Sequence, residues 1–205
     1  MLRRLPPMPP EIRAAMLRVP RHEFVPESWQ GSAYEDEPLP LPARQSTISA
    51  PHMVALQLEY ASVSPGQVVF EVGTGLGYLA ALLAELVGPS GHVVTVEVDE
   101  RLAREAELRI ARVGFSGRVE VRRGDGRLGL SEGSRFDRVV VSGATPRIEP
   151  AWVAMLKPAG ILVAPVGDAE DQTLLRMEKT PTGTRLVHGP LCRFVPLHSP
   201  TPPHI

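Results

Sequence analysis

Three glycines at alternate positions, Gly73, Gly75 and Gly77, have the spacing that most clearly indicates chemistry in this chain. They follow an apolar run that ends close to Glu71, and a helical pattern, residues 78–87, follows them. Glycines in such a place let the backbone turn tightly and approach a ligand that any Cβ would push away. The pattern is typical of the first strand–turn–helix unit of a site for an adenosine-bearing cofactor.

Two further acidic positions stand where the next two expected strands end. Glu97 closes one strand, where a carboxylate can accept hydrogen bonds from both hydroxyls of a ribose. The alternative, an ordinary acid at a strand end, fits Asp99 better, because Asp99 has the position of a helix N-cap. Asp125 stands between Gly124 and Gly126 and is either a cofactor ligand or a turn aspartate. The carboxyl ends of parallel strands are where open α/β sheets bind ligands, so the three positions together predict one site.

A hydroxyl-rich segment, residues 45–53, precedes the glycine loop. Its plainest interpretation is a helix start, with Ser49 as N-cap and Pro51 in the first turn. That interpretation accounts for Ser49 without any chemistry. Arg21, further upstream, is interpreted either as a ligand for a carboxylate or as a solvated surface charge.

Strands and helices alternate from residue 67 onward, which predicts a mostly parallel sheet with helices on both faces. The last two expected strands form an antiparallel hairpin around a turn at residues 180–183. Strands are expected over residues 67–72, 92–96, 118–122, 138–141, 160–165, 174–178 and 184–194, and core helices over 78–87, 100–113 and 150–156.

The first part of the chain is punctuated by prolines. Helices are expected over residues 11–19 and 51–60, with mostly irregular structure over residues 20–50. We therefore expect an N-terminal helical and substrate-loop extension over residues 1–65, a cofactor-binding core over 66–197 and a loose tail over 198–205.

Composition excludes several classes of function. The 205 residues carry a formal net charge of −1, so no bulk attraction to nucleic acid or to an anionic membrane is expected. No signal peptide or spanning segment is recognised, which favours a cytoplasmic protein. A single cysteine excludes an internal disulfide, and the histidines have no metal-ligand spacing, so no metal is expected. A monomer is the default expectation.

Taken together, these motifs resemble a known family. The Gly-x-Gly-x-Gly spacing with Glu71 is similar to motif I of class I S-adenosylmethionine methyltransferases. The segment Gln45–His52 is similar to the longer form of the Gln-Thr-Ile-Ser hallmark of the protein-L-isoaspartate (D-aspartate) O-methyltransferase family, and similarity extends over roughly residues 10–197. Two departures are Leu76, where serine is more common, and Pro42-Ala43-Arg44, where a glycine is usual.

The resemblance implies an α/β class I methyltransferase fold, with a doubly wound, mostly parallel seven-stranded sheet and a C-terminal antiparallel hairpin. It implies a repair enzyme that moves a methyl group from S-adenosyl-L-methionine to the free carboxylate of L-isoaspartyl residues in proteins or peptides, leaving S-adenosyl-L-homocysteine. It implies Ser49 as the catalytic residue and assigns the acceptor to Thr47, Ile48, Ser49, His52 and Val195. The cofactor residues it implies are Ser46, Thr47, Glu71, Gly73, Thr74, Gly75, Gly77, Glu97, Gly124, Asp125 and Gly126.

Other functions stay open at this point. A related class I methyltransferase that esterifies a different peptide carboxylate, such as a normal aspartate, fits the same cofactor motifs. A cofactor-binding protein that has lost activity is a second alternative, which intact Ser49, Glu97 and Asp125 disfavour. A nicotinamide-dependent dehydrogenase is disfavoured by the glycine spacing.

Overall fold

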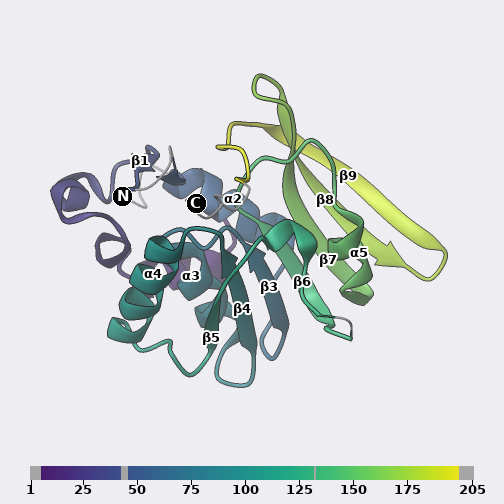
Figure 1. The fold of residues 1–205 in the computed structure, drawn as a ribbon, viewed down its shortest axis with the longest axis horizontal. Helices are drawn as coiled ribbons and strands as arrows, with labels where there is room; N and C mark the ends of the chain where they lie inside the picture. Colours follow the sequence, from purple (N-terminus) through teal and green to yellow (C-terminus); the bar gives the residue numbers. More distant parts are fainter. Residues whose placement is uncertain (1–5, 43–45, 132, 199–205) are drawn as a thin grey trace, which may run out of the picture.

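The computed structural model describes residues 6–42, 46–131 and 133–198. Its centre is a seven-stranded sheet in the order β5-β4-β3-β6-β7-β8-β9 (Figure 1). All neighbouring strands are parallel except at β8, which is antiparallel to both β7 and β9. The strands are β3 (Val68–Val72), β4 (His92–Glu97), β5 (Val119–Arg123), β6 (Phe136–Val141), β7 (Leu156–Gly167), β8 (Gln172–Thr180) and β9 (Gly183–Cys192).

The predicted fold class is confirmed. The central strands read as almost continuous apolar runs because helices cover both faces of a parallel sheet. The chain reverses its direction across the sheet between β3 and β6, which pair in parallel although they are far apart in sequence. This switch point places the ends of β3, β4, β5 and β6 along one edge, where open α/β sheets bind ligands.

Helices form a layer on each face of the sheet. The thicker layer, to which α1, α2, α3 and α4 contribute, shares a hydrophobic core with residues of β3, β4, β6 and β7. The thinner layer contains α5, whose Trp152 is fully buried against a second core cluster. The helices are α1 (Pro10–Arg18), α2 (Pro51–Ala61), α3 (Tyr78–Val87), α4 (Glu100–Arg112) and α5 (Pro150–Ala154).

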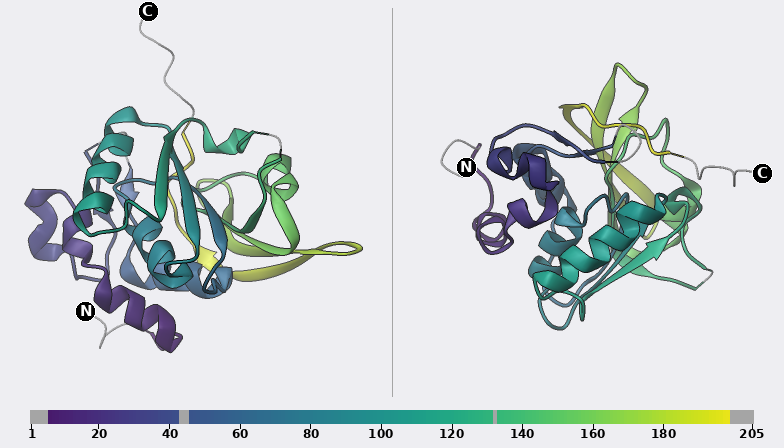
Figure 2. Two further views of the ribbon diagram at one scale, coloured as in Figure 1. Left: turned by 90° about the horizontal axis from the view of Figure 1, so that it is seen from below. Right: turned by 60° about the vertical axis from the view of Figure 1, so that its left-hand side comes forward.

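Apolar pattern and caps account for the helix boundaries. The bounds of α3 match the prediction, with Gly77 at its N-cap and Gly88 at its C-cap. Asp99 caps α4 as expected, accepting hydrogen bonds from the backbone amides of Arg101 and Leu102. The terminal hairpin is also confirmed: Thr180 pairs with Gly183 across a two-residue turn, and the hairpin extends past the helices (Figure 2).

The proline-rich segment before α2 is more ordered than predicted. Two 3₁₀-helices, η1 (Arg21–Phe24) and η2 (Glu27–Ser32), each begin directly after a proline, whose fixed φ prepares a helical turn. Two short strands, β1 (Leu39–Pro40) and β2 (Thr47–Ile48), then pair in antiparallel fashion. The segment thus contains short helical turns and a two-residue strand pair that the prediction did not specify, and its other described residues are irregular.

The N-terminal segment packs into the same core as the sheet. Buried side chains of α1 and η1 belong to one hydrophobic cluster with α3 and α4, as the purple segment beside these helices in Figure 1 illustrates. The division at residue 65 stays a prediction. Of the expected tail, residues 199–205 lie outside the described part of the chain.

Candidate active site

The glycine loop joins β3 to α3. Gly73, Gly75 and Gly77 have φ angles of +90°, +56° and +93°, which other residues adopt only with strain. A Cβ on Gly77 would lie 2.8 Å from Cδ1 of Ile110 in α4, so this glycine allows close packing between helices. Gly73 and Gly75 line a cavity, as predicted residues of a cofactor site would.

Glu71 is fully buried at the end of β3. Its Oε2 accepts a hydrogen bond of 2.5 Å from the Thr95 hydroxyl, which lies 2.6 Å from the Thr74 hydroxyl. Oε1 of Glu71 has no hydrogen-bond partner among the described residues. Burial raises the pKa of Glu71 to about 8, against the lowering effect of the Thr95 hydrogen bond. Glu71 and Thr74 therefore form a buried polar group directly below the glycine loop.

Glu97 closes β4 and reaches back to the loop. One carboxylate oxygen accepts from the amide of Gly75 at 2.8 Å and the other from the amide of Asp99 at 3.0 Å. Burial raises the pKa of Glu97, while these backbone hydrogen bonds oppose the shift. A carboxylate oxygen can accept more than one hydrogen bond, so Glu97 keeps acceptor capacity for ribose hydroxyls.

Asp125 follows β5 and has the contacts of a turn aspartate, while its role as a cofactor ligand stays a prediction. It accepts hydrogen bonds from the backbone amide of Arg127 at 3.1 Å and from its Nη2 at 2.5 Å, as a turn aspartate would, and it also lines a cavity. The hydrogen bond from the Arg127 side chain keeps the pKa of Asp125 below its ordinary value. Gly126 is required here, because a Cβ would lie 2.6 Å from Cγ1 of Val72.

Three cavities adjoin at this edge of the sheet, and Thr47 and Ser142 line all of them. The first, which we call the cofactor cavity after the sequence prediction, has a volume of about 570 Å³ including its open mouth and is lined by Ser46, Thr47, Gly73, Gly75, Glu97, Gly124, Asp125, Gly126, Ser142 and Val195, among others. The acceptor cavity, about 990 Å³ including its open mouth, is lined by Thr47, Ser49, Ala50, His52, Met53, Ser142, Cys192, Arg193 and Val195, among others. The inner cavity is lined by Thr47, Ile48, Ser49, Gln57, Glu71, Thr74, Tyr78 and Ser142, among others.

Ser49 is not the helix cap that local sequence suggested. Pro51 takes the first helical position of α2, so the N-cap is Ala50. Alanine has no polar side-chain atom, and no side-chain hydrogen bond from this residue caps the helix. The amide of His52 instead donates to Oδ1 of Asp36 at 2.9 Å. Asp36, from a distant part of the chain, performs the capping, and Ser49 stands in the walls of the acceptor and inner cavities.

The other predicted acceptor residues lie around the same cavities with different exposure. Ile48 is 8% exposed and belongs to the hydrophobic core, so most of its side chain packs inside the protein. The side chain of His52 is 41% exposed, and its Nδ1 lies 2.9 Å from Oδ1 of Asp36. The carbonyl of Val195 accepts a hydrogen bond from the amide of Ala144 at 2.8 Å.

Sequence reasoning missed Ser142. This residue directly follows β6, and its buried Oγ has no hydrogen-bond partner among the described residues. The sequence holds a signal for it, because the strand predicted over residues 138–141 ends directly before Ser142, and its neighbour across the switch point is β3. The interpretation of Arg21 as a solvated surface charge is wrong, because this residue is fully buried and donates hydrogen bonds to the backbone carbonyls of Ala33 and Ser49.

A sequence profile described as protein-L-isoaspartate (D-aspartate) O-methyltransferase matches residues 8–201. The chain belongs to this family. The family's enzyme from Methanopyrus kandleri is 46% identical over 188 residues, which cover 91% of this chain and 82% of the relative. The one from Hyperthermus butylicus is 46% identical over 195 residues, covering 91% and 80%.

Solved structures agree with this membership. A structure described as protein-L-isoaspartate O-methyltransferase superposes with a TM-score of 0.84 at 28% identity, and the match covers 92% of this chain and 61% of that longer chain. A Plasmodium falciparum protein described as a putative isoaspartate methyltransferase, in complex with S-adenosyl-L-homocysteine, has a TM-score of 0.82 at 23% identity and supports the fold. Each of the two matches covers more than nine-tenths of this chain, so the similarity extends well beyond the region around the glycine loop.

As a protein-L-isoaspartate O-methyltransferase, the protein uses S-adenosyl-L-methionine, and its residues fit that cofactor. Carboxylates end β4 and β5 beside a glycine loop, and a buried oxygen of Glu71 lacks a partner among the described residues. Leu76, the departure in motif I, is 3% exposed and packs in the core. Of the departure at Pro42-Ala43-Arg44, residues 43 and 44 lie outside the described part of the chain.

The described residues contain neither a metal-binding cluster nor a membrane-spanning helix. No group of three or more His, Cys, Asp or Glu side chains is arranged to hold a metal ion. Among the same residues, no helix has the length and apolarity to cross a membrane.

Proposed function

We propose that Ser49 orients the acceptor while this enzyme transfers the methyl group of S-adenosyl-L-methionine to the free α-carboxylate of an L-isoaspartyl residue. One observation carries the proposal. Ser49 stands in the wall of the acceptor cavity, and Thr47, Ser142 and Val195 are shared between that cavity and the cofactor cavity. Donor and acceptor can therefore meet at this shared wall.

The cofactor cavity has a group for each part of the cofactor. Glu97 is suited to the ribose and Asp125 to the adenine, while Gly73 and Gly75 allow close approach of the backbone. Ser142, in the wall of this cavity, and Glu71, in the wall of the adjoining inner cavity, offer buried oxygens without hydrogen-bond partners among the described residues. When bound, the cofactor supplies an electrophilic methyl group on a sulfonium.

The acceptor needs little chemical activation. A carboxylate with an ordinary pKa of about 4 is ionised at neutral pH, so no general base is required. The residues must instead hold one oxygen in line and exclude water, which is catalysis by positioning. A neutral hydroxyl such as that of Ser49 can donate a hydrogen bond without cancelling the negative charge. A guanidinium in direct contact would stabilise the charged ground state and slow transfer.

Paired peptides test the reaction. Purified protein is incubated with radiolabelled S-adenosyl-L-methionine and two peptides that differ only in isoaspartate or aspartate at one position. We expect base-labile label on the isoaspartyl peptide. Label on the aspartyl peptide instead would establish the alternative acceptor, and binding of S-adenosyl-L-homocysteine without label on either peptide would indicate a binding protein without activity.

The variant Ser49→Ala tests the role of the hydroxyl. We expect kcat to fall about 10- to 100-fold, the value of one hydrogen bond to a charged group. Affinity for S-adenosyl-L-homocysteine, measured by calorimetry, should change less than about twofold, because the cofactor site is intact. Ser64→Ala, before the amino end of β3, serves as the control. Wild-type turnover in Ser49→Ala would contradict the assignment.

Location and assembly are also part of the proposal. We propose a cytoplasmic enzyme acting on damaged proteins and peptides, and the near-neutral net charge gives it no bulk attraction to an anionic membrane. The protein is proposed to act as a monomer, which light scattering coupled to size-exclusion chromatography checks against the mass of 22.3 kDa.

A further inference from the structure

Arg21 is the most unusual charged residue in the described part of the chain. Its side chain is 0% exposed, yet its hydrogen bonds go to backbone carbonyls and none to a carboxylate. Nε donates to the carbonyl of Ala33 at 2.7 Å, and Nη1 donates to the carbonyl of Ser49 at 2.9 Å. The remaining nitrogen, Nη2, is buried without a hydrogen-bond partner among the described residues.

Stability alone gives a poor reason for this arrangement. Burying a cation without a paired anion is costly, and an apolar side chain of similar volume usually serves a core better. The ring of Tyr78, 5.3 Å from the guanidinium carbon, offers a favourable but modest cation–π contact. A buried guanidinium that donates to Ser49 therefore points to a role in the site.

The hydrogen bond to Ser49 constrains the acceptor loop. The peptide group that joins Ser49 to Ala50 is planar, so holding its carbonyl oxygen fixes the plane of the whole group. Both residues line the acceptor cavity. Fixing this plane limits the directions from which the Ser49 side chain leaves the backbone.

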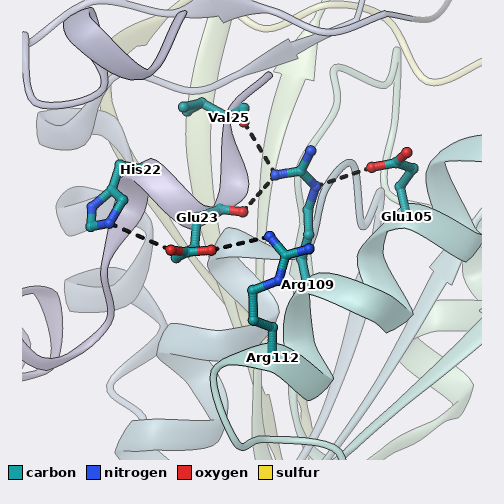
Figure 3. A network of polar contacts seen from close by, with 6 residues as sticks. All are labelled: His22, Glu23, Val25, Glu105, Arg109 and Arg112. Atoms are coloured by element: carbon teal, nitrogen blue, oxygen red, sulfur yellow. Dashed lines mark hydrogen bonds and ion pairs between the residues drawn. The ribbon is translucent and has the colours of Figure 1, made fainter. Parts of the chain in front are cut away.

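Arg21 is the first residue of η1, and arginines of α4 bind this 3₁₀-helix. Arg109 of α4 donates from Nη1 to the carbonyls of Glu23 and Val25, at 2.6 and 3.1 Å, and Arg112 lies 3.3 Å from the Glu23 carboxylate (Figure 3). These contacts attach η1 to the helix that follows β4, the strand that ends in Glu97. Hydrogen bonds from Arg109 to the backbone around η1, and from Arg21 of η1 to the carbonyl of Ser49, thus connect α4 to the segment that carries Ser49.

We propose that Arg21 is a positioning residue for methyl transfer, which holds the carbonyl of Ser49 so that the Ser49 hydroxyl meets the acceptor carboxylate in a productive orientation. This inference rests on the proposed function of Ser49. Arg21 contacts neither reactant, so the negative charge of the acceptor is preserved while its hydrogen-bond donor is kept in place.

Arg21→Met tests this inference, with Arg138→Met as a matched control. Arg138 is also a buried arginine that donates to backbone carbonyls, those of Ala61 and Ser62, but at the other end of α2. For Arg21→Met we expect kcat to fall about 10- to 100-fold, as for a small misplacement of a reacting group. Affinity for S-adenosyl-L-homocysteine and the KM for the isoaspartyl peptide should change less than about threefold. Arg138→Met should lose stability and keep kcat per folded molecule.

A double-mutant cycle separates positioning from a general structural effect. If Arg21 acts through Ser49, then Arg21→Met added to Ser49→Ala lowers kcat by less than about twofold further. Losses that multiply would overturn the inference, as would equal kcat values for Arg21→Met and Arg138→Met. If Arg21→Met does not fold, Arg21→Lys is used in the same cycle, and the same non-additivity is expected because one ammonium cannot reproduce both hydrogen bonds.

The outcomes also separate this inference from the proposed function. Wild-type protein that fails to label the isoaspartyl peptide would refute the function, and an active Ser49→Ala would refute the role of Ser49. Strong labelling, an impaired Ser49→Ala and a normal Arg21→Met would overturn only the inference about Arg21.

Discussion

Single residues in this site are placed by partners far away in the sequence. Ser49 looks like a helix cap in its local context, but Asp36 binds the amide of His52 and Ala50 occupies the N-cap position. Arg21 looks like a surface charge beside His22, yet it is buried and binds the Ser49 carbonyl. In both cases a hydrogen bond across more than a dozen residues decides the role, and a local pattern carries no information about it.

Glu71 provides a prediction about pH. Burial raises its pKa from 4.5 to about 8, so the folded protein holds this proton more tightly than the unfolded chain does. The free energy of unfolding of the cofactor-free enzyme should therefore fall as pH rises from about 5 to 8, by at most ~1.4 kcal/mol per pH unit from this one group. Urea unfolding at several pH values measures the slope.

Glu71→Gln is the matching variant. It cannot lose a proton, so its stability should fall less steeply over the same range of pH, and the two curves should diverge most above pH 8. Glu107→Gln, on the exposed face of α4, controls for the loss of one negative charge. Parallel curves for wild type and Glu71→Gln would contradict the shifted pKa.

The positions of the core helices and strands follow the pattern of apolar residues closely, because that pattern depends on which residues of each segment are buried. The strand and helix runs of the core agree with prediction within a few residues, and α3 agrees at both ends. The segment before α2 departs from prediction because its prolines start short helical turns that depend on later packing. Glycines at the ends of α3 show how a boundary is set by backbone conformation and by packing.

Gly77 and Gly114, which lies just after the end of α4, form a matched pair. Both have positive φ, +93° and +84°, so alanine at either position introduces backbone strain of about 1–2 kcal/mol. Only at Gly77 would the new Cβ meet another element, at 2.8 Å from Ile110, whereas nothing lies within 4 Å at Gly114. We expect Gly77→Ala to destabilise the protein by about 1–3 kcal/mol more than Gly114→Ala in urea unfolding. Equal losses of stability in the two variants would contradict this expectation and show that Ile110 moves away from the new Cβ at little cost in free energy.

At the scale of the whole molecule, the acceptor site joins two regions that the sequence separates. The extension before α2 contributes Ser49 and Arg21, and the sheet contributes the cofactor residues. Arg109 connects the regions, since its guanidinium binds two carbonyls around η1 and also pairs with Glu105 at 3.2 Å (Figure 3). The extension is therefore expected to be held to the sheet through α4.

Arg109→Met tests this connection. Two carbonyls would lose their donor, so we expect a loss of about 1–3 kcal/mol and faster hydrogen exchange over residues 20–40. Arg104→Met is the control on the same helix. It removes an exposed pair with Glu100 and should change stability by less than about 0.5 kcal/mol. Unchanged exchange in Arg109→Met would mean that apolar packing alone holds the extension.

The sequence by itself determined the fold class, the cofactor type and the glycines and carboxylates in the wall of the cofactor cavity. It could do so because strand periodicity, glycine spacing and acids at strand ends are local features that parallel topology brings to one edge. Only the tertiary structure decided the surroundings of Ser49, the place of Ser142 and the burial of Arg21. Each depends on contacts between segments that are distant along the chain, where the free energy of packing and hydrogen bonding outweighs local preference.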